Sequence, residues 1–198
     1  LHSLRRRQRQ MCIRDRSQSG ETADTLAGLR EAKSRFLPVL SIVNVEDSSI
    51  ARESNDNIFI HAGPEIGVAS TKAYTAQIFS LILFALYLGR LKRRVSKQVE
   101  QEIIEELKKV PENMERILSC EHEIIDIAKK YYTARDFLFL GRGVNYPSAL
   151  EGALKLKEIS YIHATGYAAG EMKHGPIALI DKDMPVICVC TKGDFYEK

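Results

Sequence analysis

Three charged side chains, Glu151, Lys155 and Glu158, share one face of a predicted helix. Positions i, i+4 and i+7 fall within about 60° of one another at the roughly 100° per residue of an α-helix. Apolar side chains flank this strip on both sides, and His174 follows in a glycine-containing segment. Two carboxylates, a lysine and a histidine are the groups that acid–base chemistry on a polar substrate requires.

The same three charges also fit an ordinary exposed helix face. A Glu and a Lys at i, i+4 are common on such faces, where the pair stabilises the helix by only about 0.2–0.5 kcal/mol. Most charged residues are simply exposed. The spacing alone therefore leaves both interpretations open, and the rest of the chain must decide between them.

Residues 17–25, the hydroxyl-rich loop, crowd four Ser and Thr side chains into nine residues at a helix start. A helix N-terminus offers unpaired N–H groups and a partial positive charge, which attract phosphate. Capping the helix needs one hydroxyl rather than four, so the spacing favours phosphate binding over simple capping. Gly20 would let the backbone approach the ligand. Glu21 would repel phosphate, so we expect it to point toward a partner subunit or the protein interior.

The basic character of the chain is confined to its first 16 residues. The net charge is +3, but residues 1–16 carry six Arg and one Asp, whereas the other 182 residues hold 23 Lys and Arg against 25 Asp and Glu. Residues 1–16 resemble a translated sequencing-adapter read. We therefore assign them no part in the fold and expect no nucleic-acid binding. A hydrophobic share of 44% is typical of a globular protein with a sizeable core.

The cysteines and the longest apolar run favour a cytoplasmic protein without a metal site or a membrane span. The four cysteines lack metal-ligand spacing, and free thiols fit a reducing compartment. Cys188 and Cys190 alternate in an apolar run, which predicts that both face the same side of a buried strand. The run at 78–89 is shorter than the roughly 20 residues a bilayer requires, so we expect a helix buried in a core or an interface.

Strands and helices alternate along the chain, which predicts an α/β fold. Strands are expected at 39–45, 57–61, 136–140 and 184–190. Helices are expected at 26–36, 50–53, 71–91 and through 151–158. The charged sequence between 91 and 132 is also expected to be helical, with a new helix that starts at Pro111. Strands that are apolar on both faces and alternate with helices imply parallel sheets covered by helices. Strand–loop–helix units recur at Ser17 and Gly141, so we expect two related halves, both incomplete.

Five motifs in order resemble the sugar isomerase (SIS) domain family, and within it the isomerase part of the glutamine–fructose-6-phosphate aminotransferases (isomerizing). The motifs are SQSGETADT at 17–25, EIGVASTKAYTAQ at 65–77, FLGRG at 139–143, ALEGALKLKEISYIHA at 149–164 and GEMKHGP at 170–176. The resemblance implies two three-layer αβα SIS units with parallel sheets. Their expected limits are 17–105 for the end of the first, 106–134 for a helical connection and 135–198 for the start of the second.

The resemblance also implies a role for each candidate residue. The residues implied to bind the sugar phosphate are Ser17, Gln18, Ser19, Thr22, Val68 and Ser70. Glu158 would be the base that moves a proton between the first two sugar carbons, and Lys155 would assist charge development at the sugar oxygen. His174 would help open the furanose ring and would reach the active site of a neighbouring subunit.

The resemblance implies a homodimer acting on fructose 6-phosphate without a metal or organic cofactor, and without nucleic-acid or membrane partners. The implied reaction makes glucosamine 6-phosphate from fructose 6-phosphate and glutamine-derived ammonia, toward UDP-N-acetylglucosamine. The family's glutaminase domain, the start of its first SIS unit and its imine-forming lysine have no counterpart in this sequence. We therefore expect residues 1–198 to be inactive by themselves.

Two other functions share the hydroxyl-rich loop and stay open. The first is another SIS phosphosugar isomerase or a deglycase, against which the motifs KLKEISYIHA and KHGP argue. The second is a non-catalytic regulator that binds sugar phosphates. Such a regulator would have no need of Glu158, Lys155 and His174 together.

Overall fold

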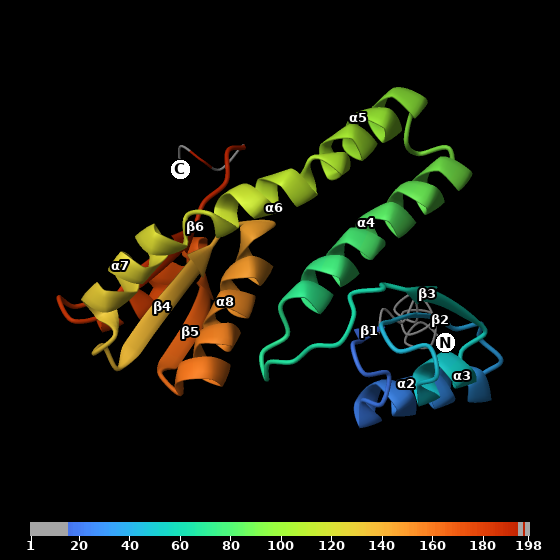
Figure 1. Ribbon diagram of the computed structural model, residues 1–198, viewed down its shortest axis with the longest axis horizontal. Helices are drawn as coiled ribbons and strands as arrows, with labels where there is room; N and C mark the ends of the chain where they lie inside the picture. Colours follow the sequence, from blue (N-terminus) through green and yellow to red (C-terminus); the bar gives the residue numbers. More distant parts are fainter. Residues whose placement is uncertain (1–15, 194–195, 197–198) are drawn as a thin grey trace. The chain divides into compact units, whose positions relative to one another are not determined.

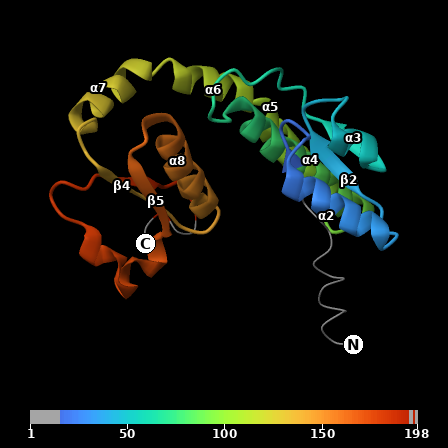
Figure 2. The same cartoon turned by 90° about the horizontal axis from the view of Figure 1, so that it is seen from below.

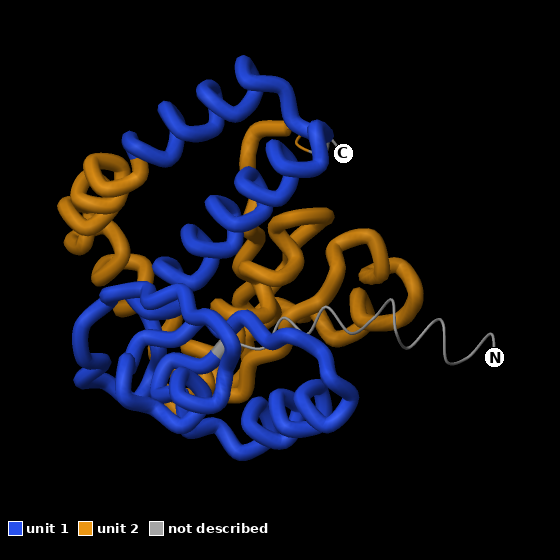
Figure 3. The backbone as a smooth tube through the Cα atoms, turned by 90° about the vertical axis from the view of Figure 1, so that its right-hand side faces the viewer, with its two compact units in different colours: residues 1–109 blue, residues 110–198 orange. Residues whose placement is uncertain are grey.

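The computed structural model describes residues 16–193 and residue 196. They belong to two compact units, which divide between residues 109 and 110 (Figure 3). The predicted adapter-derived residues, apart from the backbone of Arg16, lie outside the described residues, and so does Cys12. The proposed limits of the two SIS units and their helical connection stay a prediction.

A parallel sheet forms the centre of the first unit. Its strands, in spatial order, are β1 (Arg16–Ser17), β2 (Leu40–Val43) and β3 (Asp56–Phe59). The helices are α2 (Ala23–Ser34), α3 (Ser49–Glu53), α4 (Lys72–Leu91) and α5 (Lys97–Lys108). Figure 1 shows α2 and α3 below this sheet and α4 above it, and Figure 2, seen from below, shows α2 in front of β2.

The core of the first unit lies between β2 and the helix pair α2–α3. Val43 is fully buried there against Leu29 and Ile50. Because side chains alternate along a strand, Ile42 points to the opposite face, the side on which α4 contacts β2. Each such aliphatic side chain removed from water contributes about 1.5–3 kcal/mol. Val43 pairs with Ser17 of β1, so this packing lies beside the strand end from which the hydroxyl-rich loop departs.

Helix α4 is less buried than its apolar sequence predicts. Several of its large side chains are exposed in the described part of the chain, namely Ile82, Leu83, Tyr87, Leu88 and Leu91. The expectation of a helix buried in this chain's own core is therefore wrong, and burial in an interface stays a prediction. Among the described residues, this is the one helix that could cross a membrane by length and composition, a test that core helices also pass.

The second unit contains another parallel sheet, with β4 at its centre. The strand order is β5 (His163–Ala168), β4 (Asp136–Gly141) and β6 (Val186–Val189). The helices are α6 (Val110–Leu118), α7 (Glu121–Tyr131), α8 (Asn145–Ser160) and the short 3-10 helices η1 (Ala169–His174) and η2 (Pro176–Leu179). Helix α8 packs on this sheet through Ala149 and Ala153, which contact the region of Phe139 and Ala164. Small side chains let helix and sheet approach closely.

Most expected elements are present, and the parallel sheets of an α/β fold are confirmed. A new helix begins beside Pro111, as expected. Strand β5 was not predicted, because its sequence HATGYA is rich in small residues and resembles a loop. The expected burial of Cys188 and Cys190 is wrong, since β6 is an edge strand in the described sheet and both cysteines are exposed.

Candidate functional site

Helix α8 brings Glu151, Lys155 and Glu158 together as one Glu–Lys–Glu cluster. Lys155 Nζ lies 2.7 Å from Glu158 Oε2 and 3.3 Å from Glu151 Oε1. The three side chains are 26%, 20% and 31% exposed in chain order, so the cluster is half-buried rather than a solvated face. The helical spacing therefore predicts the contacts, and the burial argues against the ordinary surface interpretation.

The lysine of the cluster is a firmly held cation. Burial by itself lowers the pKa of Lys155, but the hydrogen bonds from its ammonium to Glu158 and Glu151, together with their negative charges, outweigh this effect and raise the pKa. Lys155 therefore stays protonated at neutral pH and suits electrostatic stabilisation of a developing oxyanion better than proton abstraction. A carboxylate remains available beside it as a base.

His174 lies at the end of η1 and does not join the cluster by a hydrogen bond or ion pair within the described residues. Its nearest charged contact is Glu171, with 4.0 Å between His174 Nε2 and Glu171 Oε2. The imidazole side chain is 73% exposed. The structure thus brings three of the four residues of this predicted group together and leaves the histidine at the surface of the second unit.

The hydroxyl-rich loop begins at the last residue of β1 and runs into the first turn of α2. The hydroxyls of Ser17 and Thr22 are hydrogen-bonded at 2.8 Å, and Ser17 Oγ also accepts from the Gly20 N–H at 2.9 Å. Ser19 Oγ accepts from the Glu21 N–H at 3.2 Å. Ser17 is buried, Gln18 half-buried, and Ser19 and Thr22 exposed. Internal bonds therefore shape the loop and leave its outer hydroxyls accessible.

None of these hydroxyls caps the helix that follows. Thr22 is the N-cap residue of α2, but no side chain in the described part of the chain caps this helix. The first-turn N–H groups therefore lack a side-chain acceptor beside a cluster of hydroxyls, which is the arrangement that binds phosphate. Simple capping, the alternative explanation of the Ser and Thr residues, is not what the structure shows.

A second loop of the first unit carries Val68 and Ser70 in front of α4. The Glu65 carboxylate organises it, because Oε1 accepts from the N–H groups of Ala73 (2.9 Å) and Thr71 (3.2 Å) and from the Ser70 hydroxyl (3.4 Å). The Ala73 N–H is the main cause of a lowered pKa for Glu65. Val68 is 92% exposed.

Glu65 was not predicted as part of the site. The sequence did contain a signal for Glu65. Helix α4 has no acidic residue in its first turn, and Glu65 is an acidic residue a few positions before it.

The six substrate-binding candidates thus lie in the first unit, whereas the Glu–Lys–Glu cluster and His174 lie in the second. A cavity of about 530 Å³ in the second unit contains none of them. Charged and uncharged residues from two segments, 130–136 and 181–184, line it. Within the described residues, no group of three His, Cys, Asp or Glu side chains could hold a metal ion.

Comparison with known families gives one match, which spans both units. The sequence model described as the SIS domain matches residues 10–87 and 130–197. Together these ranges cover more than half of the chain. The matched ranges include the hydroxyl-rich loop, the Val68–Ser70 loop, the Glu–Lys–Glu cluster and His174.

Curated relatives and solved structures agree with the family match. Over 182 residues the chain is 54% identical to a glutamine–fructose-6-phosphate aminotransferase (isomerizing) of Thermus thermophilus, covering 92% of this chain and 30% of the relative. The C-terminal domain of a glucosamine–fructose-6-phosphate aminotransferase from Francisella tularensis superimposes with a TM-score of 0.90 at 46% identity, covering 92% of this chain and 52% of that one. A putative phosphosugar isomerase from Clostridium difficile gives 0.83 at 25% identity, covering 91% and 52%.

Proposed function

Since the chain belongs to the SIS domain family, we propose that it binds the phosphate of a hexose 6-phosphate and catalyses proton transfer between the first two carbons of the sugar. The parent reaction that we propose is the formation of glucosamine 6-phosphate from fructose 6-phosphate and glutamine-derived ammonia. The names of the relatives at 50–55% identity support this choice. The chain spans about a third of the length of those relatives.

The observation that carries the proposal is the half-buried pair of Lys155 and Glu158, 2.7 Å apart. An aldose–ketose shift needs a base beside the carbon acid and a positive charge beside the enolate-like oxygen. In our proposal Glu158 takes the proton from C1 of the open-chain substrate and returns it to C2. The proton of the C1 hydroxyl passes to the C2 oxygen, so that the carbonyl moves from C2 to C1, and Lys155 stabilises the negative charge that develops on oxygen meanwhile. Atoms and electrons balance within the substrate, so this step itself uses no oxidant or cofactor.

The phosphate would be held by the hydroxyl-rich loop through Ser17, Gln18, Ser19 and Thr22, together with the uncapped N-terminus of α2. Val68 and Ser70 would contact the sugar. We also propose that His174, whose side chain is exposed, reaches the active site of a neighbouring subunit in a homodimer and helps to open the furanose ring there. We further propose that the protein is cytoplasmic and has no membrane or nucleic-acid partner.

Deuterium exchange tests this function without needing ammonia. The protein that carries this chain at full length is incubated with fructose 6-phosphate in D₂O, and NMR follows exchange at C1 and the appearance of glucose 6-phosphate. Enzyme-dependent exchange supports the proposal. Binding of fructose 6-phosphate without any exchange would favour the non-catalytic regulator instead.

A further inference from the structure

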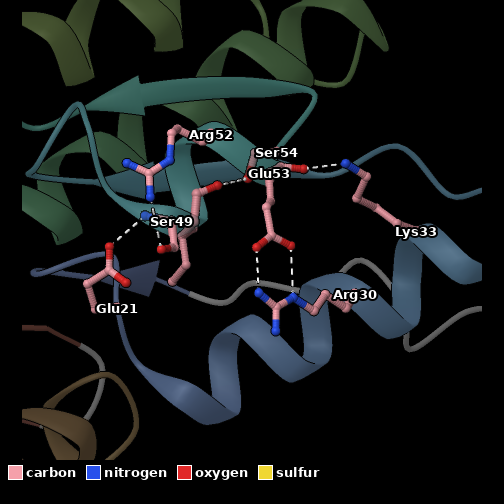
Figure 4. Close-up of polar contacts among 8 residues, drawn as sticks. Glu21, Arg30, Lys33, Ser49, Arg52, Glu53 and Ser54 are labelled. Carbon is pink, nitrogen blue, oxygen red and sulfur yellow. Dashed lines mark hydrogen bonds and ion pairs between the residues drawn. The ribbon is translucent and has the colours of Figure 1, made fainter.

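The hydroxyl-rich loop contains a carboxylate, Glu21, whose charge opposes phosphate binding. The structure shows which group the Glu21 carboxylate contacts. Glu21 Oε1 accepts a hydrogen bond of 2.6 Å from the N–H of Ser49, the first residue of α3 (Figure 4). This backbone bond is the main cause of a lowered pKa for Glu21, and the Ser49 side chain and Arg52 act in the same direction. The Glu21 carboxylate therefore accepts a hydrogen bond from a backbone N–H of the first unit.

Two further contacts join the same loop to the same helix. Gly20 O accepts from the Ile50 N–H at 3.0 Å. Gly20 has a φ of +67°, and a Cβ at this position would lie 2.0 Å from Ser48 Oγ, so only glycine allows this close approach. Residues 20 and 21 of the loop thus contact three consecutive residues, 48–50, at the start of α3.

Helix α3 is held by contacts with α2 and with the core of the first unit. Arg30 of α2 binds Glu53 with two hydrogen bonds of 2.9 and 2.6 Å, and Lys33 Nζ donates to Glu53 O at 2.6 Å (Figure 4). Ile50 is buried in the core of the first unit. Both helices that border the loop are therefore tied to each other, and Glu21 ties the loop to them.

We infer that Glu21 is a positioning residue of the phosphate site. Its hydrogen bond to the Ser49 N–H holds the loop against α3, turns the negative charge away from the ligand and keeps Ser19 and Thr22 directed outward. This inference rests on the proposed function, since it assumes that the loop binds a sugar phosphate. In this inference Glu21 affects substrate binding by holding the loop in place, and it does not contact the substrate.

Three substitutions of Glu21 separate the effect of its hydrogen bond to the Ser49 N–H from the effect of its negative charge. Glu21→Gln keeps an oxygen that can accept from the Ser49 N–H but loses the charge. Glu21→Asp keeps the charge but is too short to reach, and Glu21→Ala loses both. Glu31→Gln is the matched control, because Glu31 is an exposed carboxylate of α2 that accepts from Arg35 Nε at 2.7 Å, away from the loop.

The measurements are the Kd of fructose 6-phosphate and the KM and kcat of C1 exchange, all in the full-length protein. We expect Glu21→Asp and Glu21→Ala to raise Kd and KM by about tenfold or more, the effect of losing a hydrogen bond to a charged group, with little change in kcat. Glu21→Gln and the control should stay within about threefold of the unsubstituted protein.

Several outcomes would overturn the inference. If Glu21→Gln and Glu21→Ala both tightened binding, the carboxylate would face the phosphate. If Glu21→Asp and Glu21→Ala bound as well as the unsubstituted protein, the tether would not position the loop. If the unsubstituted protein failed to bind fructose 6-phosphate, the proposed function would fail first, and this inference would fall with it.

Discussion

Lys155 is the residue on which the proposed chemistry of the second unit depends. It is shared between two carboxylates, and its shorter contact is to Glu158 at i+3 rather than to Glu151 at i−4. Glu158 thus has the closer positive charge, and Glu151 is left as an orienting partner. On an exposed helix such contacts contribute little, but partial burial strengthens each of them.

Replacing Lys155 with Met should lower the rate of C1 exchange by about 10²- to 10³-fold, because a preorganised charge at the developing oxyanion is lost. Lys157→Met is the matched control: Lys157 is exposed on the same helix and forms no ion pair within the described residues. Its exchange rate should be unchanged. Equal rates for Lys155→Met and the control would show that Lys155 plays no part in charge stabilisation.

The residues of the candidate site differ in how far the sequence predicts them. The Glu–Lys–Glu cluster follows from helical spacing, because its three residues lie within about two turns and Lys155 contacts both carboxylates. The partner of Glu21 could not be predicted, since Ser49 is 28 residues away and the contact depends on how α3 packs. The sequence predicted that Glu21 points toward a partner subunit or the protein interior. The structure shows an exposed carboxylate bonded to the Ser49 N–H, so the interior is not where it lies, and a partner subunit stays a prediction.

At the scale of elements, strands with strong apolar patterns were predictable and strands of small residues were not. Strand β2 contains LSIV and β4 contains DFLFLG, which both favour a buried strand. Strand β5 has no such pattern, and its identity comes from pairing with β4 along six residues. Its glycine and alanines suit a close neighbour, because Gly166 lies directly against Leu150 of α8.

The turn between β4 and α8 makes a specific prediction about packing. A Cβ on Gly141 would lie 2.2 Å from the Asn145 carbonyl oxygen, which is backbone and cannot move aside easily. Gly141→Ala should therefore destabilise the second unit by about 1–3 kcal/mol. Urea unfolding of the chain, followed by circular dichroism, measures this.

Gly170→Ala is the control for that substitution, because nothing lies within 4 Å of a Cβ there. It should change the stability by no more than about 0.5 kcal/mol. If both variants unfolded at the same urea concentration, the close approach of α8 to β4 would not be a source of stability.

In the whole molecule, the family match spans both units, and the candidate residues are divided between them. The first holds the substrate-binding candidates and the second the Glu–Lys–Glu cluster. The fold class and the parallel sheets could be predicted from the alternation of strands and helices, and the family from five motifs in order. The exposure of α4 could not be predicted, because an apolar pattern along a helix does not indicate which surface covers that helix.

We propose above all that Glu158 moves a proton on a sugar phosphate that the hydroxyl-rich loop binds. The most direct test is the rate of C1 exchange of fructose 6-phosphate in D₂O by full-length Glu158→Gln protein, with the Kd measured alongside. The predicted result is a rate lower by about 10²- to 10⁴-fold, the usual contribution of a general base, with a Kd close to that of the unsubstituted protein. A near-normal exchange rate in this variant would contradict the account.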